Sequence, residues 1–190
     1  MQSEAAVIAR ICHDLITPFN AINLGLEAFE MSRDESLLAS LRESVDKANV
    51  IMKFMRELFS DRAQTFCYSA PSLKQLIAEY LKFYNISFDL VSDMESVASI
   101  AGKIIMYMAI ITKEISPFGG NVVVKIDNEK SEINTRCSGR NIAMPQMSLE
   151  DELNHKSIIR HKFLQLLQDS GFELNIYADG SDVVFSKKMK

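Results

Sequence analysis

Residues 11–22 have the sequence ICHDLITPFNAI, which places a histidine, an acid and a proline close together inside a long helical pattern. Apolar residues through this stretch recur at alternating intervals of four and three positions, the repeat of a helix face that packs against a partner helix. The series consists of Ile8, Cys12, Leu15, Phe19, Ile22, Leu26 and Phe29. The pattern therefore predicts a long amphipathic helix.

A second apolar series of the same kind follows the short segment SRDES at residues 32–36. It consists of Leu38, Leu41, Val45, Ala48, Met52, Met55 and Phe59. We call both series together the apolar seam. The short connection makes the two helices antiparallel neighbours. Because a lone hairpin cannot bury both halves of the seam, we expect two copies of the chain to form a four-helix bundle with shallow crossing angles. The alternative is a hairpin that packs on the C-terminal part of its own chain.

His13 lies one position after a seam residue, about 100° around the helix, so it should flank the seam and face water. Thr17 and Asn20 lie four and seven positions further on and share its face. Pro18 removes the hydrogen bond that the carbonyl of Asp14 would accept, so we expect a kink beside His13. An exposed histidine alone is most simply a solvated side chain. Together with an acid, a proline and an asparagine at these offsets, it indicates a site.

This stretch resembles the H-box of two-component histidine kinases, H-[ED]-x-x-[TN]-P-[LF]-x-x-[IL], in which the histidine is phosphorylated. The matching residues are His13, Asp14, Thr17, Pro18, Phe19 and Ile22. The resemblance implies that His13 carries a phosphoryl group and that the hairpin is the dimerisation hairpin of that family.

The remainder of the chain predicts a domain of mixed helices and strands, after an interruption of the helical pattern at residues 66–72. The expected helices are 73–84, 100–115 and 156–168, and the expected strands are 86–91, 122–126, 132–137, 172–176 and 183–186, with a turn at Asp179-Gly180. We therefore predict an α+β chain with two domains. Residues 1–65 form the hairpin for dimerisation and phosphotransfer, and residues 72–190 form an α/β sandwich.

The order of elements in the second domain resembles the ATPase domain of histidine kinases. The stretch ITKEISPFGGNVVVKID, residues 111–127, stands where that family has its N-box helix, Gly-Gly turn and following strand. The resemblance implies that ATP binding would need an N-box asparagine for magnesium and glycine-rich loops around the nucleotide. Here residues 112–114 are Thr-Lys-Glu, and residues 135–149 contain a single glycine, Gly139. Without those glycines backbone amides cannot cradle phosphates, so we expect a degenerate domain with no nucleotide, no metal and no cofactor of its own.

An H-box hairpin joined to a degenerate ATPase-like domain is similar to the ChpT-type histidine phosphotransferases over essentially the whole chain. This resemblance implies transfer from an aspartyl phosphate on the receiver domain of a hybrid kinase to His13, and from His13 to the receivers of response regulators. The receivers would supply Mg²⁺. Two other functions stay open: an active ATP-dependent sensor kinase core, and a non-catalytic interaction protein with the same fold.

The remaining residues of the predicted site surround His13. Asp14 would hold or tune the imidazole, and Thr17 and Asn20 would contact the receiver or orient a water. The second helix passes His13 near residues 54–58, since the hairpin is antiparallel. The expected partner-binding residues are Arg10, Ile16, Thr17, Asn20, Phe54, Glu57 and Leu58. We expect His155 and His161 to be solvated surface residues, because their spacing of six fits no metal pair on one helix face.

Composition narrows the classes of partner. The net charge is -4 and acidic and basic residues are interleaved, so we expect no nucleic-acid partner. No apolar run approaches the roughly 18 residues of a membrane span, so we expect a cytoplasmic protein with no membrane contact. Cys12, Cys67 and Cys137 are odd in number and widely spaced, which fits neither a disulfide framework nor a zinc site.

Overall fold

The computed structural model divides the chain into two compact units, one built on a helical hairpin and one on a sheet. The described residues are 2–61, 65–127, 132–149 and 152–189. The hairpin unit consists of Met1–Phe59 and Leu153–Ile158, and the sheet unit consists of Ser60–Glu152 and Ile159–Lys190. Residues 153–158 thus group with the hairpin, although the sequence placed them in the C-terminal domain.

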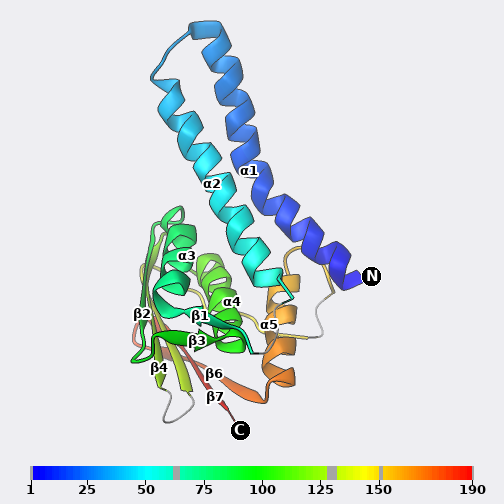
Figure 1. Cartoon of the computed structure of the whole chain (residues 1–190), viewed down its shortest axis with the longest axis vertical. Helices are drawn as coiled ribbons and strands as arrows, with labels where there is room; N and C mark the ends of the chain where they lie inside the picture. The colour runs from blue at the N-terminus through cyan, green and yellow to red at the C-terminus, as the bar shows by residue number, and fades with distance from the viewer. Residues whose placement is uncertain (1, 62–64, 128–131, 150–151, 190) are drawn as a thin grey trace. The chain divides into compact units, whose positions relative to one another are not determined.

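The hairpin consists of α1 (Gln2–Ser32) and α2 (Leu37–Phe59), which lie side by side and run in opposite directions (Figure 1). α1 stays helical through Pro18. In Figure 1 its N-terminal part runs in a different direction from the rest of the helix, as a proline inside a helix predicts.

The turn between the helices follows from local chemistry. Arg33 adopts φ of 55° and donates its backbone N–H to the carbonyl of Phe29 at 2.8 Å, which closes the end of α1. Asp34 accepts a hydrogen bond from the backbone N–H of Ser36 at 2.9 Å. Hydrogen bonds from the Ser36 side chain and backbone lower the pKa of Asp34. The carboxylate therefore occupies the position of a helix cap just before α2.

Much of the apolar seam stays exposed within one chain. Its exposed members are Ile8, Cys12, Phe19, Leu26, Leu38, Val45 and Met52. The side chains of α1 that the chain does bury recur every four residues and include two charges. They are Ala6, Arg10, Asp14 and Pro18. α1 thus has a buried stripe beside its exposed apolar one.

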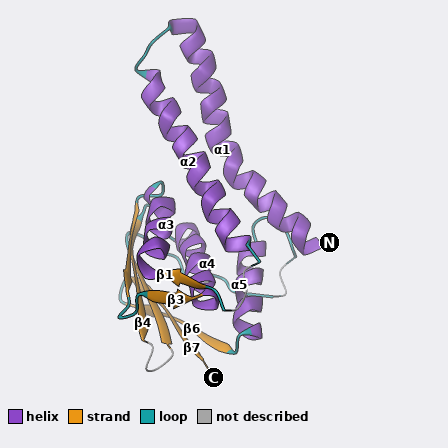
Figure 2. Cartoon of the chain, viewed as in Figure 1, coloured by secondary structure: helices purple, strands orange, loops and turns teal. Residues whose placement is uncertain are grey.

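The sheet unit is a two-layer α/β arrangement. Its five-stranded sheet has the order β2-β4-β5-β7-β6. The strands are β2 (Ile86–Val91), β4 (Gly120–Asp127), β5 (Glu132–Ser138), β6 (Phe172–Asp179) and β7 (Asp182–Met189). β2 and β4 are parallel and the other neighbours are antiparallel. The helices α3 (Ala70–Lys82), α4 (Ser99–Ile115) and α5 (Ile158–Asp169) lie on one side of the sheet (Figure 2).

Every helix and strand that the sequence predicted for this unit is present, with each end within three residues of its predicted position. The predicted α+β class is therefore confirmed. The sequence missed a small antiparallel ribbon of β1 (Cys67–Ser69) and β3 (Ser96–Ala98), because three residues are too few to show a period. The hairpin turn is Gly180-Ser181, one residue later than predicted, since Asp179 pairs with Asp182 across it.

Candidate functional site

His13 lies on α1 with its side chain 59% exposed, and its ring is held at one edge by the next residue. Its Nδ1 lies 3.2 Å from Oδ1 of Asp14. If Nδ1 carries the ring proton, the carboxylate accepts it, and Nε2 keeps a free lone pair. An exposed neutral imidazole with one nitrogen anchored in this way is a nucleophile that a large partner can reach.

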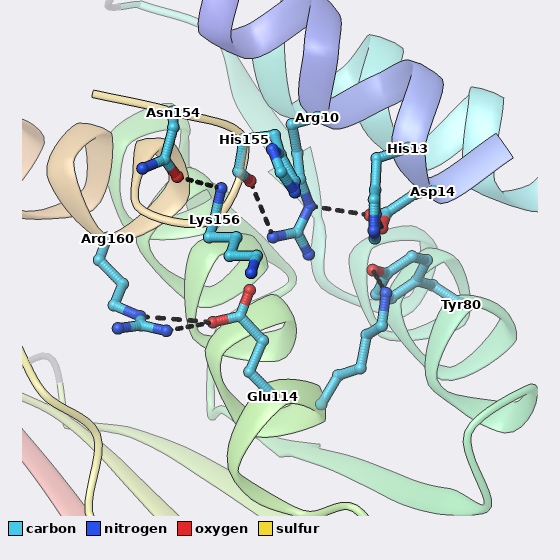
Figure 3. A network of polar contacts seen from close by, with 10 residues as sticks. Arg10, His13, Asp14, Tyr80, Glu114, Asn154, His155, Lys156 and Arg160 are labelled. Atoms are coloured by element: carbon cyan, nitrogen blue, oxygen red, sulfur yellow. Dashed lines mark hydrogen bonds and ion pairs between the residues drawn. The ribbon is translucent and has the colours of Figure 1, made fainter. Parts of the chain in front are cut away.

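The carboxylate of Asp14 is itself buried, and a second residue of α1 pairs with it. Only 4% of the Asp14 side chain and 7% of the Arg10 side chain are exposed. Arg10 Nε donates to Asp14 Oδ2 at 3.1 Å, from one helical turn earlier. Asp14 therefore uses one oxygen for Arg10 and the other for His13, which fixes the carboxylate between them (Figure 3).

A distant segment of the chain completes this cluster. The ring of His155 stacks on the ring of His13, with 4.9 Å between the ring centroids and 29° between the ring planes. Arg10 Nη1 also donates to the backbone carbonyl of His155 at 3.4 Å. All four residues belong to the hairpin unit, and Figure 3 shows them together. The expectation that His155 is a solvated surface residue is wrong.

The segment that carries His155 is ordered by its own hydrogen bonds. Asn154 Oδ1 accepts from the backbone N–H groups of Lys156 at 2.8 Å and Ser157 at 3.2 Å. Ser157 Oγ accepts from the backbone N–H of Asn154 at 3.1 Å. This reciprocal pair is the arrangement of a capping box, here at the start of α5. This cap was not predicted from the sequence, and no spacing links His155 to a histidine 142 positions earlier.

The predicted partner-binding residues divide into an exposed set and a buried set. Ile16, Thr17 and Asn20 are exposed on α1, and Glu57 is partly exposed on α2. Arg10, Phe54 and Leu58 are buried, with 6%, 0% and 1% of each residue exposed. Their side chains expose little surface here, and their part in docking a partner stays a prediction.

His161 also differs from the sequence expectation. It is partly buried on α5, and its Nδ1 is buried with no hydrogen-bond partner among the residues that the structure describes. The interpretation of His161 as solvated surface is therefore wrong as well. The burial of His161 depends on the elements that pack against α5, and the spacing of the histidines in the sequence gave no information on those elements.

The residues at the N-box position all contact other parts of the sheet unit. Thr112 Oγ1 lies 3.2 Å from Cys137 Sγ. Lys113 Nζ lies 4.3 Å from the centroid of the Tyr84 ring. Glu114 accepts hydrogen bonds from Arg160 at 3.2 Å and 3.4 Å (Figure 3). These three side chains serve the packing of the unit.

The Gly-Gly turn has a packing role too. Gly119 adopts φ of +80°, and a Cβ there would lie 2.4 Å from the backbone oxygen of Asn85. A Cβ at Gly120 would lie 2.4 Å from the backbone oxygen of Ser138. Glycine is therefore required where β4 passes close to the start of β2 and the end of β5.

The described residues bear on two other classes of site. None of their helices combines the length and hydropathy that a membrane span requires. Over the same residues, no group of three or more His, Cys, Asp or Glu side chains is placed to hold a metal ion.

Comparison with known proteins gives consistent matches. Residues 70–182 match the family of the histidine phosphotransferase C-terminal domain. Protein phosphotransferase ChpT of Brucella abortus (strain 2308) is 26% identical over 194 residues, which cover 96% of this chain and 93% of that protein. The name of this relative describes a protein phosphotransferase.

Solved structures share the fold along nearly the whole chain. The structure of a bacterial phosphotransferase superimposes with a TM-score of 0.86 at 24% identity, covering 98% of this chain and 95% of that one. The Acinetobacter baumannii histidine kinase AdeS gives a TM-score of 0.52 at 14% identity, covering 94% of this chain and 97% of that one. The predicted likeness to histidine kinases is therefore confirmed for the fold. The family match at residues 70–182 spans more than half of this chain, so the chain belongs to the histidine phosphotransferase family.

Proposed function

We propose that His13 accepts a phosphoryl group from the aspartyl phosphate of one receiver domain and passes it to the receiver of a response regulator. The observation that carries this proposal is an exposed imidazole whose Nδ1 lies against the buried carboxylate of Asp14. The family supports a phosphotransferase in a phosphorelay, although His13 itself lies outside the matched residues 70–182.

The transfer requires little of the histidine side beyond position and charge. Nε2 attacks the phosphorus, the bond from phosphorus to the receiver carboxylate breaks, and its electron pair stays on that carboxylate. No proton has to leave Nε2, because it is unprotonated in the neutral ring. The phosphorylated ring keeps its Nδ1 proton and becomes cationic, and the Asp14 carboxylate offsets that charge. Phosphoryl transfer of this loose, in-line kind depends mostly on positioning and electrostatics.

The receiver would supply the metal. Mg²⁺ binds to clustered carboxylate oxygens, and receivers present these together with the aspartyl phosphate. On this chain Asp14 already pairs with Arg10 and His13. The exposed residues Ile16, Thr17 and Asn20 would form the surface of α1 that meets the receiver.

We further propose that the sheet unit binds no ATP, which argues against a sensor kinase core. The N-box side chains contact Cys137, Tyr84 and Arg160. The Gly-Gly turn is accounted for by the close approach of backbone at Asn85 and Ser138. Neither feature therefore needs a nucleotide to explain it.

We also propose a homodimer through the apolar seam. Leu38, Val45 and Met52 lie seven residues apart on α2, and all three are exposed. A row at this spacing is a coiled-coil contact. Sedimentation should give a dimer at micromolar concentration, and a monomer there would contradict the proposal.

The test of the proposed function is transfer from a labelled, phosphorylated receiver to the purified chain. Wild type and His161→Gln should take up label, and His13→Gln should take up none. His161→Gln makes the same chemical change in the sheet unit. The thermal stability of His13→Gln should stay within about 0.5 kcal/mol of wild type, because His13 is exposed.

Other results would favour the other functions. Label on wild type from ATP alone, without a receiver, would identify a sensor kinase core. A folded wild type that takes label from neither source would identify a non-catalytic interaction protein. Label on His13→Gln would move the acceptor to another residue.

A further inference from the structure

We propose that His155 is a positioning residue for phosphoryl transfer at His13, so that the acceptor site is built from two pieces of chain 142 positions apart. This inference rests on the proposed function of His13. It is carried by the stacked rings, whose centroids lie 4.9 Å apart, and by the grouping of residues 153–158 with the hairpin.

The stacked ring supplies a restraint that α1 alone lacks. A histidine exposed on a helix can turn among several rotamers, and ordering it costs entropy. Asp14 holds the Nδ1 edge of the His13 ring, and the His155 ring covers one of its faces. The two contacts restrain the ring about different axes and leave the Nε2 edge for a receiver. In-line transfer is sensitive to such placement, since small errors in orientation reduce rates strongly.

Arg10 couples the two restraints. Its Nε donates to Asp14 and its Nη1 donates to the backbone carbonyl of His155. The buried guanidinium of Arg10 thus anchors both the Asp14 carboxylate, which contacts the His13 ring, and the backbone of His155, whose ring stacks on His13. Because the bond from Arg10 reaches a backbone oxygen, a substitution of the His155 side chain leaves this anchor intact. The cap between Asn154 and Ser157 is likewise independent of the His155 ring.

The contact that does the positioning is the ring face. The alternative would be a positive charge that attracts the phosphoryl group, which the exposed neighbour Lys156 could supply equally well. Phenylalanine keeps an aromatic face of similar size but has no ring nitrogen and no charge. His155→Phe therefore separates stacking from charge, and Lys156→Ala serves as the control for charge in the same segment.

The experiment measures the rate of phosphoryl uptake from a phosphorylated receiver as a function of receiver concentration. His155→Ala should lower the limiting rate by roughly two- to tenfold, the range expected from the loss of an aromatic pair. The half-saturating receiver concentration should stay unchanged. His155→Phe should recover the limiting rate, and Lys156→Ala should match wild type in both quantities.

A second measurement does not depend on transfer. In the NMR spectrum of the unphosphorylated protein, the ring protons of His13 should shift in His155→Ala, because the ring current of the neighbour is lost. They should stay in place in Lys156→Ala. Thermal unfolding of each variant establishes that it is folded.

Several outcomes of these two measurements would overturn the role proposed for His155. A folded His155→Ala variant with the limiting rate of wild type overturns the proposal. His13 ring resonances that do not shift in His155→Ala overturn it too. A His155→Phe as slow as His155→Ala overturns positioning by the ring face. A slowed Lys156→Ala assigns the effect to charge and has the same consequence. If wild type takes up no label, the proposed function fails and the role of His155 fails with it, whereas the NMR shifts still establish whether the rings stack.

Discussion

The two units of the chain each bury a basic side chain, and they do so in opposite ways. In the hairpin unit, Arg10 and Asp14 are almost fully buried and pair with each other at 3.1 Å. In the sheet unit, Lys187 on β7 is fully buried, and its Nζ has no hydrogen-bond partner among the described residues. The hydroxyl of Thr135 on the adjacent strand β5 is buried as well, and it too has no partner within the described part of the chain.

The difference shows in protonation. A buried charge costs free energy unless a partner offsets it, and a buried amine without a partner instead gives up its proton. Burial lowers the pKa of Lys187 to about 7, with a small opposing effect of Cys137. Burial likewise raises the pKa of Cys137 to about 11. The hydrogen bonds around His13 fix the orientation of the side chains there. The buried Lys187 and Thr135 side chains are not held by such bonds among the described residues.

Loss of the hairpin's buried cation should have the largest effect on stability. Arg10→Gln leaves the Asp14 carboxylate buried without its counter-charge, so the free energy of unfolding should fall by about 3–5 kcal/mol. Urea denaturation at pH 7 measures it. The control is Arg10→Gln combined with Asp14→Asn, in which a neutral amide pair should recover part of the loss. If Arg10→Gln lowers the free energy of unfolding by less than about 1 kcal/mol, the pair stabilises the protein no more than a surface ion pair does.

Loss of the sheet unit's buried amine should act in the opposite direction. Lys187→Met removes an amine without a partner and keeps a flexible apolar chain, so it should raise the free energy of unfolding by roughly 1–4 kcal/mol at pH 6. Lys125→Met, at an exposed position of β4, is the matched control and should change little. If Lys187→Met destabilises the protein, the amine has a partner after all.

The same variant has a pH signature. Between pH about 7 and 10.5 the unfolded chain binds a proton at Lys187 that the folded chain does not, so the stability contributed by this residue rises with pH. The advantage of Lys187→Met over wild type should therefore shrink from pH 6 to pH 9. Above pH 9 the raised pKa of Cys137 makes stability fall with pH, so denaturation is measured below that. An advantage that stays constant from pH 6 to pH 9 would contradict the lowered pKa.

The sequence predicted the elements of both units but not the partners within the hairpin. Periodicity identifies the whole apolar face of a helix, whether or not one chain buries it. It therefore identified the seam through Phe19 and Met52, which are exposed in one chain, and missed the buried stripe of Arg10 and Asp14. A charge in a buried stripe is predicted as solvated unless its partner is known, and here the partners are side chains one helical turn apart.

The position of His155 could not be predicted for a different reason. His155 reaches His13 through a tertiary contact between residues 142 positions apart, and neither residue's local sequence encodes that contact. The sequence did predict that His13, Asp14 and Pro18 lie together, because these residues fall within two turns of a single helix. Local chemistry was therefore predictable, and the contribution of the distant segment was not.

The smallest expected effect concerns the ion pair of Glu114 and Arg160 in the sheet unit, which sharpens the contrast with Arg10 and Asp14. The side chains are 27% exposed for Arg160 and 18% for Glu114, and the nitrogen-to-oxygen distance of 3.2 Å is close to that of the hairpin pair. If burial rather than distance sets the value of a pair, this one is partly screened by water and contributes less. Because Glu114 has further contacts, a double-mutant cycle of Glu114→Gln and Arg160→Gln isolates the pair. Urea denaturation should give a coupling free energy of about 0.2–1 kcal/mol that decreases in 1 M salt. A coupling as large as that of the hairpin pair, and insensitive to salt, would show that exposure does not distinguish the two.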